Sequence, residues 1–157
     1  MQPILNFAQQ AWDQQAERFI KVIESMPDEA LTWQPTSAET NSVAQLVRHT
    51  FGSLPLLLGL ARGDAPPPAP EQMREMAARL WRNDAATKED LIDQIKGSLA
   101  QRDRVLAQLD EMDLNEEVAG LRGTRPRTAM VAGFVSHSAE HVGHVELTKQ
   151  VWEAQQP

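Results

Sequence analysis

The sequence HSAEHVGH, residues 137–144, holds three of the four histidines of this 157-residue chain. On an α-helix, where successive residues are about 100° apart, His141 and His144 fall about +40° and −20° from His137. All three imidazoles therefore share one helix face. His137 and His141 have the i,i+4 spacing with which two imidazoles reach one metal ion. This face is a candidate metal site.

Two ligands bind a metal weakly, so a third should come from elsewhere in the chain. The remaining histidine, His49, interrupts another apolar helical stretch. If the two helices are neighbours in a bundle, His49, His137 and His141 supply three neutral nitrogen donors and leave coordination positions open. For one histidine taken alone, a polar position on a helix surface is the better interpretation. For the set of three, we favour metal binding.

A second metal motif also matches the stretch. His137, Glu140 and His141 fit the H-x-x-E-H pattern of inverzincin peptidases, with Glu140 as the general base. The sequence ends at Pro157, too soon for the distant downstream ligand of those enzymes. So short a pattern also has many chance matches. We therefore reject the peptidase interpretation.

Several segments together carry a resemblance to a known family. SMPDEALTWQP at residues 25–35 is followed by Asn-Ser-Val at 41–43, by His49, and by His-x-x-x-His-x-Gly at 137–143. This order resembles the DinB-like superfamily along nearly the whole chain. The resemblance implies a four-helix bundle, commonly a homodimer.

By the same resemblance, the ligands of a divalent metal are His49, His137 and His141. The family pattern usually has Gln where this chain has His144. His144 could therefore be a fourth ligand, a group that supports the ligands, or a substrate contact. Glu140 is a further candidate contact near the metal.

Characterised members of this family include metal-dependent transferases and isomerases that use small thiols such as bacillithiol, mycothiol or glutathione. The resemblance thus implies a metal-dependent transferase or isomerase in which the ion activates a thiolate. The alternative is a non-catalytic metal- or ligand-binding protein of the stress response. Three imidazoles suit Zn, Ni, Fe or Cu, and we expect Zn or Ni. Because a ligating histidine must be neutral, metal should be lost as the pH falls toward and below about 6.5.

Composition limits the other classes of function. A length of 157 residues predicts one domain over residues 1–157. There is no cysteine, so any thiol chemistry needs an external thiol. A formal net charge of −7 disfavours nucleic acid as a partner. The N-terminus does not read as a targeting signal, and no apolar run approaches the roughly 20 residues of a membrane span. We expect no membrane association and a cytoplasmic protein.

Apolar residues at three- and four-residue steps predict an all-α four-helix bundle with long connections after helices 1 and 2. The first connection should run to Thr40, and the second contains the Pro-rich residues 65–70. Capping signals stand at residues 41–42 and 87–90. The expected long helices are 4–26, 42–62, 87–111 and 128–154, with a short helix over 71–80.

Three residue types inside these elements call for interpretation. Arg102 interrupts an apolar stripe, so it snorkels, pairs across the core or lines a cavity near the metal, and we favour snorkelling. Gly143 costs about 1 kcal/mol relative to Ala in a helix, which indicates close helix approach or room for a ligand beside His141. Trp33 and Trp81 are interpreted as anchors that pack on the bundle.

Residues 115–127 are predicted as a loop that carries Arg122, Arg125 and Arg127. This basic cluster leads into a helix N-terminus, where the helix dipole prefers acidic residues. A solvated loop is the favoured interpretation, and the mismatch of charge is a weak indication of function.

The second helix holds more leucines than one core stripe needs, namely Leu56, Leu57, Leu58 and Leu60. An apolar face of this kind suits a subunit interface. Together with the family resemblance, it predicts a homodimer.

Overall fold

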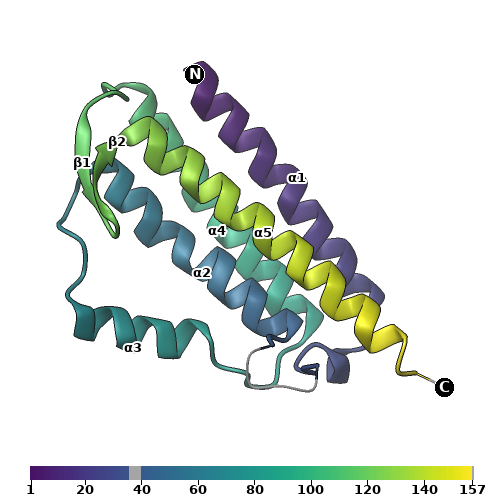
Figure 1. The fold of residues 1–157 in the computed structure, drawn as a ribbon. Coiled ribbons are helices and arrows are strands. Elements are labelled where there is room, and N and C mark those ends of the chain that lie inside the picture. Colours follow the sequence, from purple (N-terminus) through teal and green to yellow (C-terminus); the bar gives the residue numbers. More distant parts are fainter. Residues whose placement is uncertain (36–39, 157) are drawn as a thin grey trace.

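Four long helices pack side by side in the computed structural model, which describes residues 1–35 and 40–156 (Figure 1). Helices α1 and α2 each pack against both α4 and α5. The predicted all-α four-helix bundle is confirmed, and the long helices closely follow their expected bounds. These helices are α1 (Pro3–Ser25), α2 (Val43–Arg62), α4 (Lys88–Asp110) and α5 (Arg127–Glu153).

Local hydrogen bonds set the ends of α2 and the start of α4. The Ser42 hydroxyl accepts from the Gln45 amide at 3.2 Å, and the Gln45 side-chain oxygen accepts from the Ser42 amide at 3.0 Å. Thr87 and Asp90 form the same capping box at the start of α4. Helix α2 ends at Gly63, whose φ of 81° is the left-handed conformation that glycine adopts without strain.

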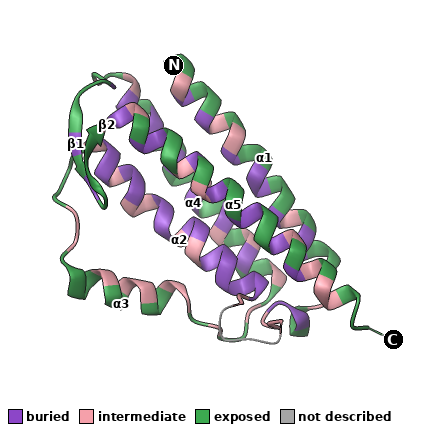
Figure 2. Cartoon of the chain, viewed as in Figure 1, coloured by how far each residue is buried: buried purple, intermediate pink, exposed green. Residues whose placement is uncertain are grey.

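Buried apolar side chains fill the bundle in two groups, and the buried residues line the facing sides of the helices (Figure 2). The largest buried side chains of the first group include Phe19, Ile23, Phe51, Leu91 and Ile95. Those of the second group are Leu5, Trp12, Leu58 and Leu106.

The connections after α1 and α2 are both long, as predicted. A 3₁₀ turn (Asp28–Ala30) follows α1, and four residues of this first connection, 36–39, lie outside the described ranges. The Pro-rich segment leads to α3 (Pro70–Leu80), the short helix expected over 71–80. Helix α3 packs against α2 and contains no buried residue (Figure 2).

A β-hairpin replaces the loop predicted over residues 115–127. Strands β1 (Glu117–Gly120) and β2 (Gly123–Pro126) pair antiparallel, with Gly120 opposite Gly123. Gly123 has a φ of 95°, which suits the tight turn. The prediction of a loop was wrong because each strand has only four residues and β2 shows no alternation of buried and exposed side chains.

The leucines of α2 do not form the expected apolar surface. Leu57, Leu58 and Leu60 are buried within the chain, and Leu56 is half-buried. Leu58 and Leu60 belong to the second core group, and Leu56 packs against it. Leu56 and Leu57 line a cavity described below. The argument for a homodimer from these leucines was therefore wrong.

Within the described residues, every helix is too short or too polar to cross a lipid bilayer.

Candidate metal centre

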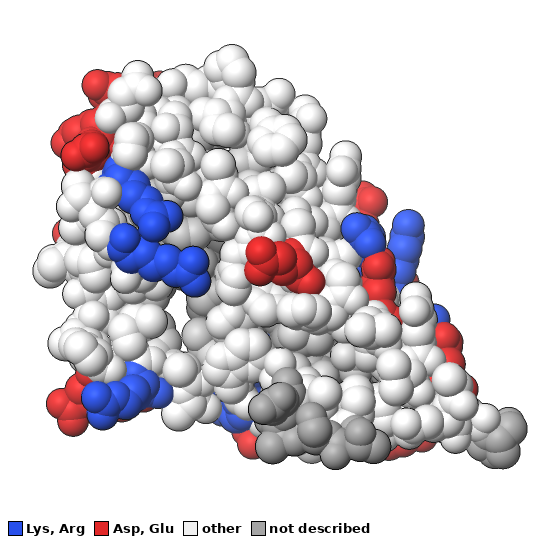
Figure 3. Space-filling model, viewed as in Figure 1, with Lys and Arg blue, Asp and Glu red and all other residues white. Residues whose placement is uncertain are grey.

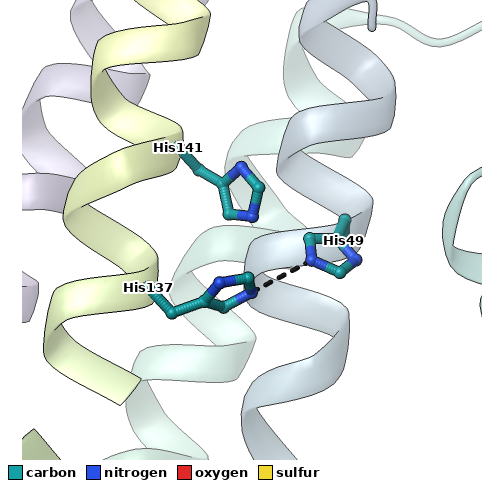
Figure 4. A group of neighbouring side chains, drawn as sticks. All are labelled: His49, His137 and His141. Carbon is teal, nitrogen blue, oxygen red and sulfur yellow. Dashed lines mark hydrogen bonds between the residues drawn. The ribbon is translucent and has the colours of Figure 1, made fainter. Parts of the chain in front are cut away.

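Three histidines from two helices meet inside the bundle (Figure 4). His49 lies on α2, and His137 and His141 lie one turn apart on α5. One ring nitrogen from each lies within 4.8 Å of the others. The ring centroid of His141 is 4.8 Å from that of His49 and 4.5 Å from that of His137. The packing of α2 on α5 thus brings together the three histidines that the sequence grouped, which we call the histidine triad.

One distance in the triad matches the geometry of a shared ion. The Nε2 atoms of His49 and His137 are 3.1 Å apart. Two nitrogens, each about 2.0–2.1 Å from one ion, stand about 2.8–3.4 Å apart in octahedral or tetrahedral coordination. The same distance also suits a hydrogen bond between two neutral imidazoles. The pair of His49 and His137 therefore has the spacing of two ligands of one ion.

Buried nitrogen atoms of the triad lack partners among the described residues. Both ring nitrogens of His141 and Nδ1 of His49 form no hydrogen bond there. His141 is only 8% exposed. A buried polar atom without a partner costs free energy, so native structures seldom retain one without a reason. A cation between the three rings would take up a lone pair of His141.

Burial sets the protonation state of the triad. Burial, together with smaller effects of the neighbouring imidazoles, lowers the pKa of His49 to about 4 and that of His141 to about 3. Burial also lowers the pKa of His137, with Glu140 raising it and Arg122 lowering it. All three rings are therefore neutral near pH 7, the state in which an imidazole donates a lone pair to a metal.

A cavity of about 500 Å³ opens beside the triad, and His49 and His137 form part of its lining. Its walls come from α2, α3, α5 and the β-hairpin. Figure 3 shows the hollow, with Lys and Arg side chains gathered over the hairpin beside it. The charged lining residues are Arg122, Arg125 and Glu140. The apolar lining includes Leu56, Leu57, Met73, Met76, Leu80 and Phe134.

A model of the DinB superfamily matches residues 11–145. The chain belongs to the DinB superfamily. Among solved structures, a conserved protein from Enterococcus faecalis has a TM-score of 0.70 at 20% identity, over 92% of this chain and 94% of that one. A mycothiol-dependent maleylpyruvate isomerase has a TM-score of 0.67 at 15% identity, over 90% of this chain and 60% of its own. A histidine-to-alanine variant of such an isomerase gives 0.66 at 15% identity. No curated protein matched. These likenesses show a shared fold.

Two further candidate contacts of this DinB protein lie beside the triad. Glu140 is exposed and belongs to the lining of the cavity. His144 is exposed on α5, with its ring centroid 5.5 Å from that of His141. His144 is not among the lining residues of the cavity. His144 thus contacts the ring of His141 from outside the cavity.

Arg102 does not reach the cavity. Its guanidinium is 2% exposed and donates to the Asp13 carboxylate at 2.8 Å and the Gln9 carbonyl at 3.3 Å, both on α1. It also donates to Asp103 at 2.7 and 2.9 Å. The sequence favoured snorkelling of Arg102 over an ion pair or a place in the cavity. The structure shows the ion pair instead. The pair joins α4 to α1.

Trp81, which the sequence indicated only as an anchor, belongs to the site. Its ring stacks on His49 with centroids 4.0 Å apart and planes at 17°. It also forms part of the cavity lining. The stacked ring restricts the rotation of the His49 imidazole and shields it from water. No pattern near Trp81 in the sequence signalled this contact, because it depends on the path of α3.

Gly143 lies on the exposed side of α5. A Cβ atom there would meet no described heavy atom within 4 Å. Close approach of a second helix at this position was therefore a wrong prediction, and Gly143 is not among the residues of the cavity lining.

Proposed function

We propose that this chain binds one divalent metal ion, Zn or Ni, on His49, His137 and His141, and that it catalyses a metal-dependent transfer or isomerisation with a small-molecule thiol. The observation that carries the proposal is the triad itself: one buried and two half-buried imidazoles whose ligand nitrogens lie within 4.8 Å of one another, beside a cavity of about 500 Å³. A cavity of this size suits a small-molecule ligand.

Three nitrogen donors leave coordination positions for a ligand from the cavity. A bound divalent ion would supply Lewis acidity and lower the pKa of a thiol that binds to it. The chain has no cysteine, so the nucleophilic sulfur has to enter as a co-substrate. The fold similarity to a mycothiol-dependent isomerase supports the same class of chemistry.

The residues of the chain have distinct tasks in this proposal. Trp81 orients His49, and the half-buried side chains of α3 limit the access of water to the cavity. Glu140 lines the cavity and interacts with His137. It is placed to accept the proton that a thiol releases on becoming a thiolate.

Cobalt substitution tests the proposal. The Co²⁺ protein should change its visible absorption when glutathione, as a probe thiol, is added, because a thiolate ligand alters the spectrum. S-methylglutathione, which cannot form a thiolate, should leave the spectrum unchanged. The metal-loaded protein is then incubated with the thiol and a panel of electrophiles, to test whether a thiol-dependent product forms. Thiol binding without product would favour the alternative, a non-catalytic metal- or ligand-binding protein of the stress response.

We also propose a homodimer, on the family resemblance and on two exposed apolar side chains. Phe7 on α1 and Leu147 on α5 are each 57% exposed and could join a subunit contact. Light scattering of the metal-loaded protein at micromolar concentration tests this, and a monomer mass would reject it.

A further inference from the structure

We propose that Arg122 and Arg125 form an anion-binding site for an organic monocarboxylate whose apolar part fills the cavity beside the triad. This inference names a substrate class and to that extent rests on the proposed function. The binding step itself does not require the chemistry to be correct.

The three arginines around the hairpin differ in what they bind. Arg127 is 4% exposed, donates to Glu116 at 2.5 Å and to the Arg62 carbonyl at 3.2 Å, and so ties the hairpin to the bundle. Arg122 and Arg125 form no ion pair with any described residue. Among the described residues, Arg125 makes one hydrogen bond, to the Arg122 carbonyl at 3.4 Å. Two guanidinium groups at the cavity are thus free to bind a ligand.

Both arginines belong to the lining of the same cavity as His49 and His137. A ligand held by the arginines would therefore lie beside the metal position. The planar guanidinium donates two parallel hydrogen bonds to a carboxylate, which orients the ligand as well as binding it.

The charge of the lining favours an anion. Arg122 and Arg125 contribute two positive charges and Glu140 contributes one negative charge. The side chains of the lining therefore carry a net charge of +1, in a chain whose net charge is −7, and a divalent ion on the triad would add to the positive charge. A basic rim on an acidic protein attracts small anions locally while the remaining surface repels them.

The opposite wall selects an apolar body. Met73, Met76 and Leu80 lie on the face of α3 that lines the cavity. All three side chains are only half-buried. Leu56 and Phe134 continue this surface on α2 and α5. A ligand with a hydrocarbon chain would cover these side chains, at about 0.8 kcal/mol for each buried methylene.

A binding experiment on the full-length protein as purified tests the site. Hexanoate and its neutral isostere hexanamide are titrated by NMR into the wild type and into three variants: Arg122→Gln, Arg125→Gln and the double variant. Arg104→Gln is the matched control, because Arg104 is exposed on α4 and outside the cavity lining. All these samples hold the same metal, so any bond between carboxylate and metal contributes equally.

The double variant should bind hexanoate about tenfold more weakly or worse, since two charge-assisted interactions are lost. Hexanamide binding and the Arg104→Gln variant should match the wild type. Affinity should also rise about fourfold per methylene from acetate to hexanoate. Equal affinity for hexanoate and hexanamide, an equal loss in Arg104→Gln, or no binding of hexanoate would overturn the proposal.

Competition then identifies which substrate carries the carboxylate. If glutathione displaces hexanoate and 2-mercaptoethanol does not, the arginines hold the carboxylate of the thiol. If hexanoate stays bound with either thiol present, they hold the second substrate. Metal analysis of the same samples separates the two proposals: protein without metal but with arginine-dependent selectivity would reject the proposed function and retain this site.

Discussion

The Nε2 atom of His49 lies 3.1 Å from the Nε2 atom of His137, although 88 positions separate the two residues in the sequence. The packing of α2 on α5 brings these two residues together. His141, one turn further along α5, is the third member of the triad. Metal binding at this site therefore depends on the packing of α2 on α5.

Metal should stay bound at a lower pH than free imidazoles would allow. Only a neutral imidazole ligates, so proton and metal compete for the same lone pair. Burial lowers the pKa of His49 to about 4 and that of His141 to about 3, so fewer protons compete at a given pH than at the usual pKa of about 6.5. Metal should be retained at pH 6 and released only near and below pH 4. Metal analysis after dialysis from pH 7 to pH 3 measures this, and half-release near pH 6.5 would contradict it.

Replacing Trp81 should weaken metal binding without removing a ligand. Trp81→Ala frees the His49 ring to rotate, and the loss of a group that orients a ligand typically costs about tenfold in metal affinity. Trp81→Phe keeps a stacked ring and should stay near the wild type. Competition with a chromophoric chelator gives the affinities. Trp152→Ala is the control, since Trp152 also packs against the first core group; equal affinities in the two alanine variants would exclude a role for the stacking.

Arg102 should matter for stability and not for metal. Arg102→Ala removes a buried side chain and its hydrogen bonds to Asp13 and Asp103, and should lower the free energy of unfolding by about 2–4 kcal/mol. Arg102→Met keeps most of the volume and should cost less. Urea unfolding measures both. Metal content should equal that of the wild type, and its loss in Arg102→Met would show that Arg102 supports the triad after all.

Two glycines should respond to alanine in opposite directions. At Gly120 a Cβ would lie 2.7 Å from the Met130 sulfur and 3.2 Å from the Gly123 carbonyl oxygen, so Gly120→Ala should destabilise the hairpin by about 1–3 kcal/mol. At Gly143 nothing described lies within 4 Å, so Gly143→Ala should stabilise α5 by up to about 1 kcal/mol. Thermal unfolding of both variants compares them. A destabilised Gly143→Ala variant would mean that this face of α5 is covered in solution.

The sequence predicted the helices well because their determinants are local. The capping box of Ser42 and Gln45, the left-handed Gly63 and the apolar periods all act within a few residues. The triad was predictable for the same reason, since His137 and His141 share a helix face and His49 was the one remaining histidine.

The errors concern positions that only tertiary contacts determine. The hairpin strands are too short to show a period, and Gly143 lies on a face whose surroundings the sequence does not specify. The extra leucines of α2 serve a second core group. Trp81 reaches His49 because α3 returns along α2 after a Pro-rich connection, a path that no local pattern encodes. That residues 1–157 form one domain stays a prediction.

The central claim is that one ion binds to three histidines, and the metal content of untagged protein purified without added metal tests it most directly. The wild type should contain about one Zn or Ni per chain. His49→Ala, His137→Ala and His141→Ala should each lose it, while His144→Ala, which removes an exposed histidine from the same helix, should retain it. Circular dichroism would confirm that each variant is folded. Full metal content in a folded His137→Ala variant would contradict the claim.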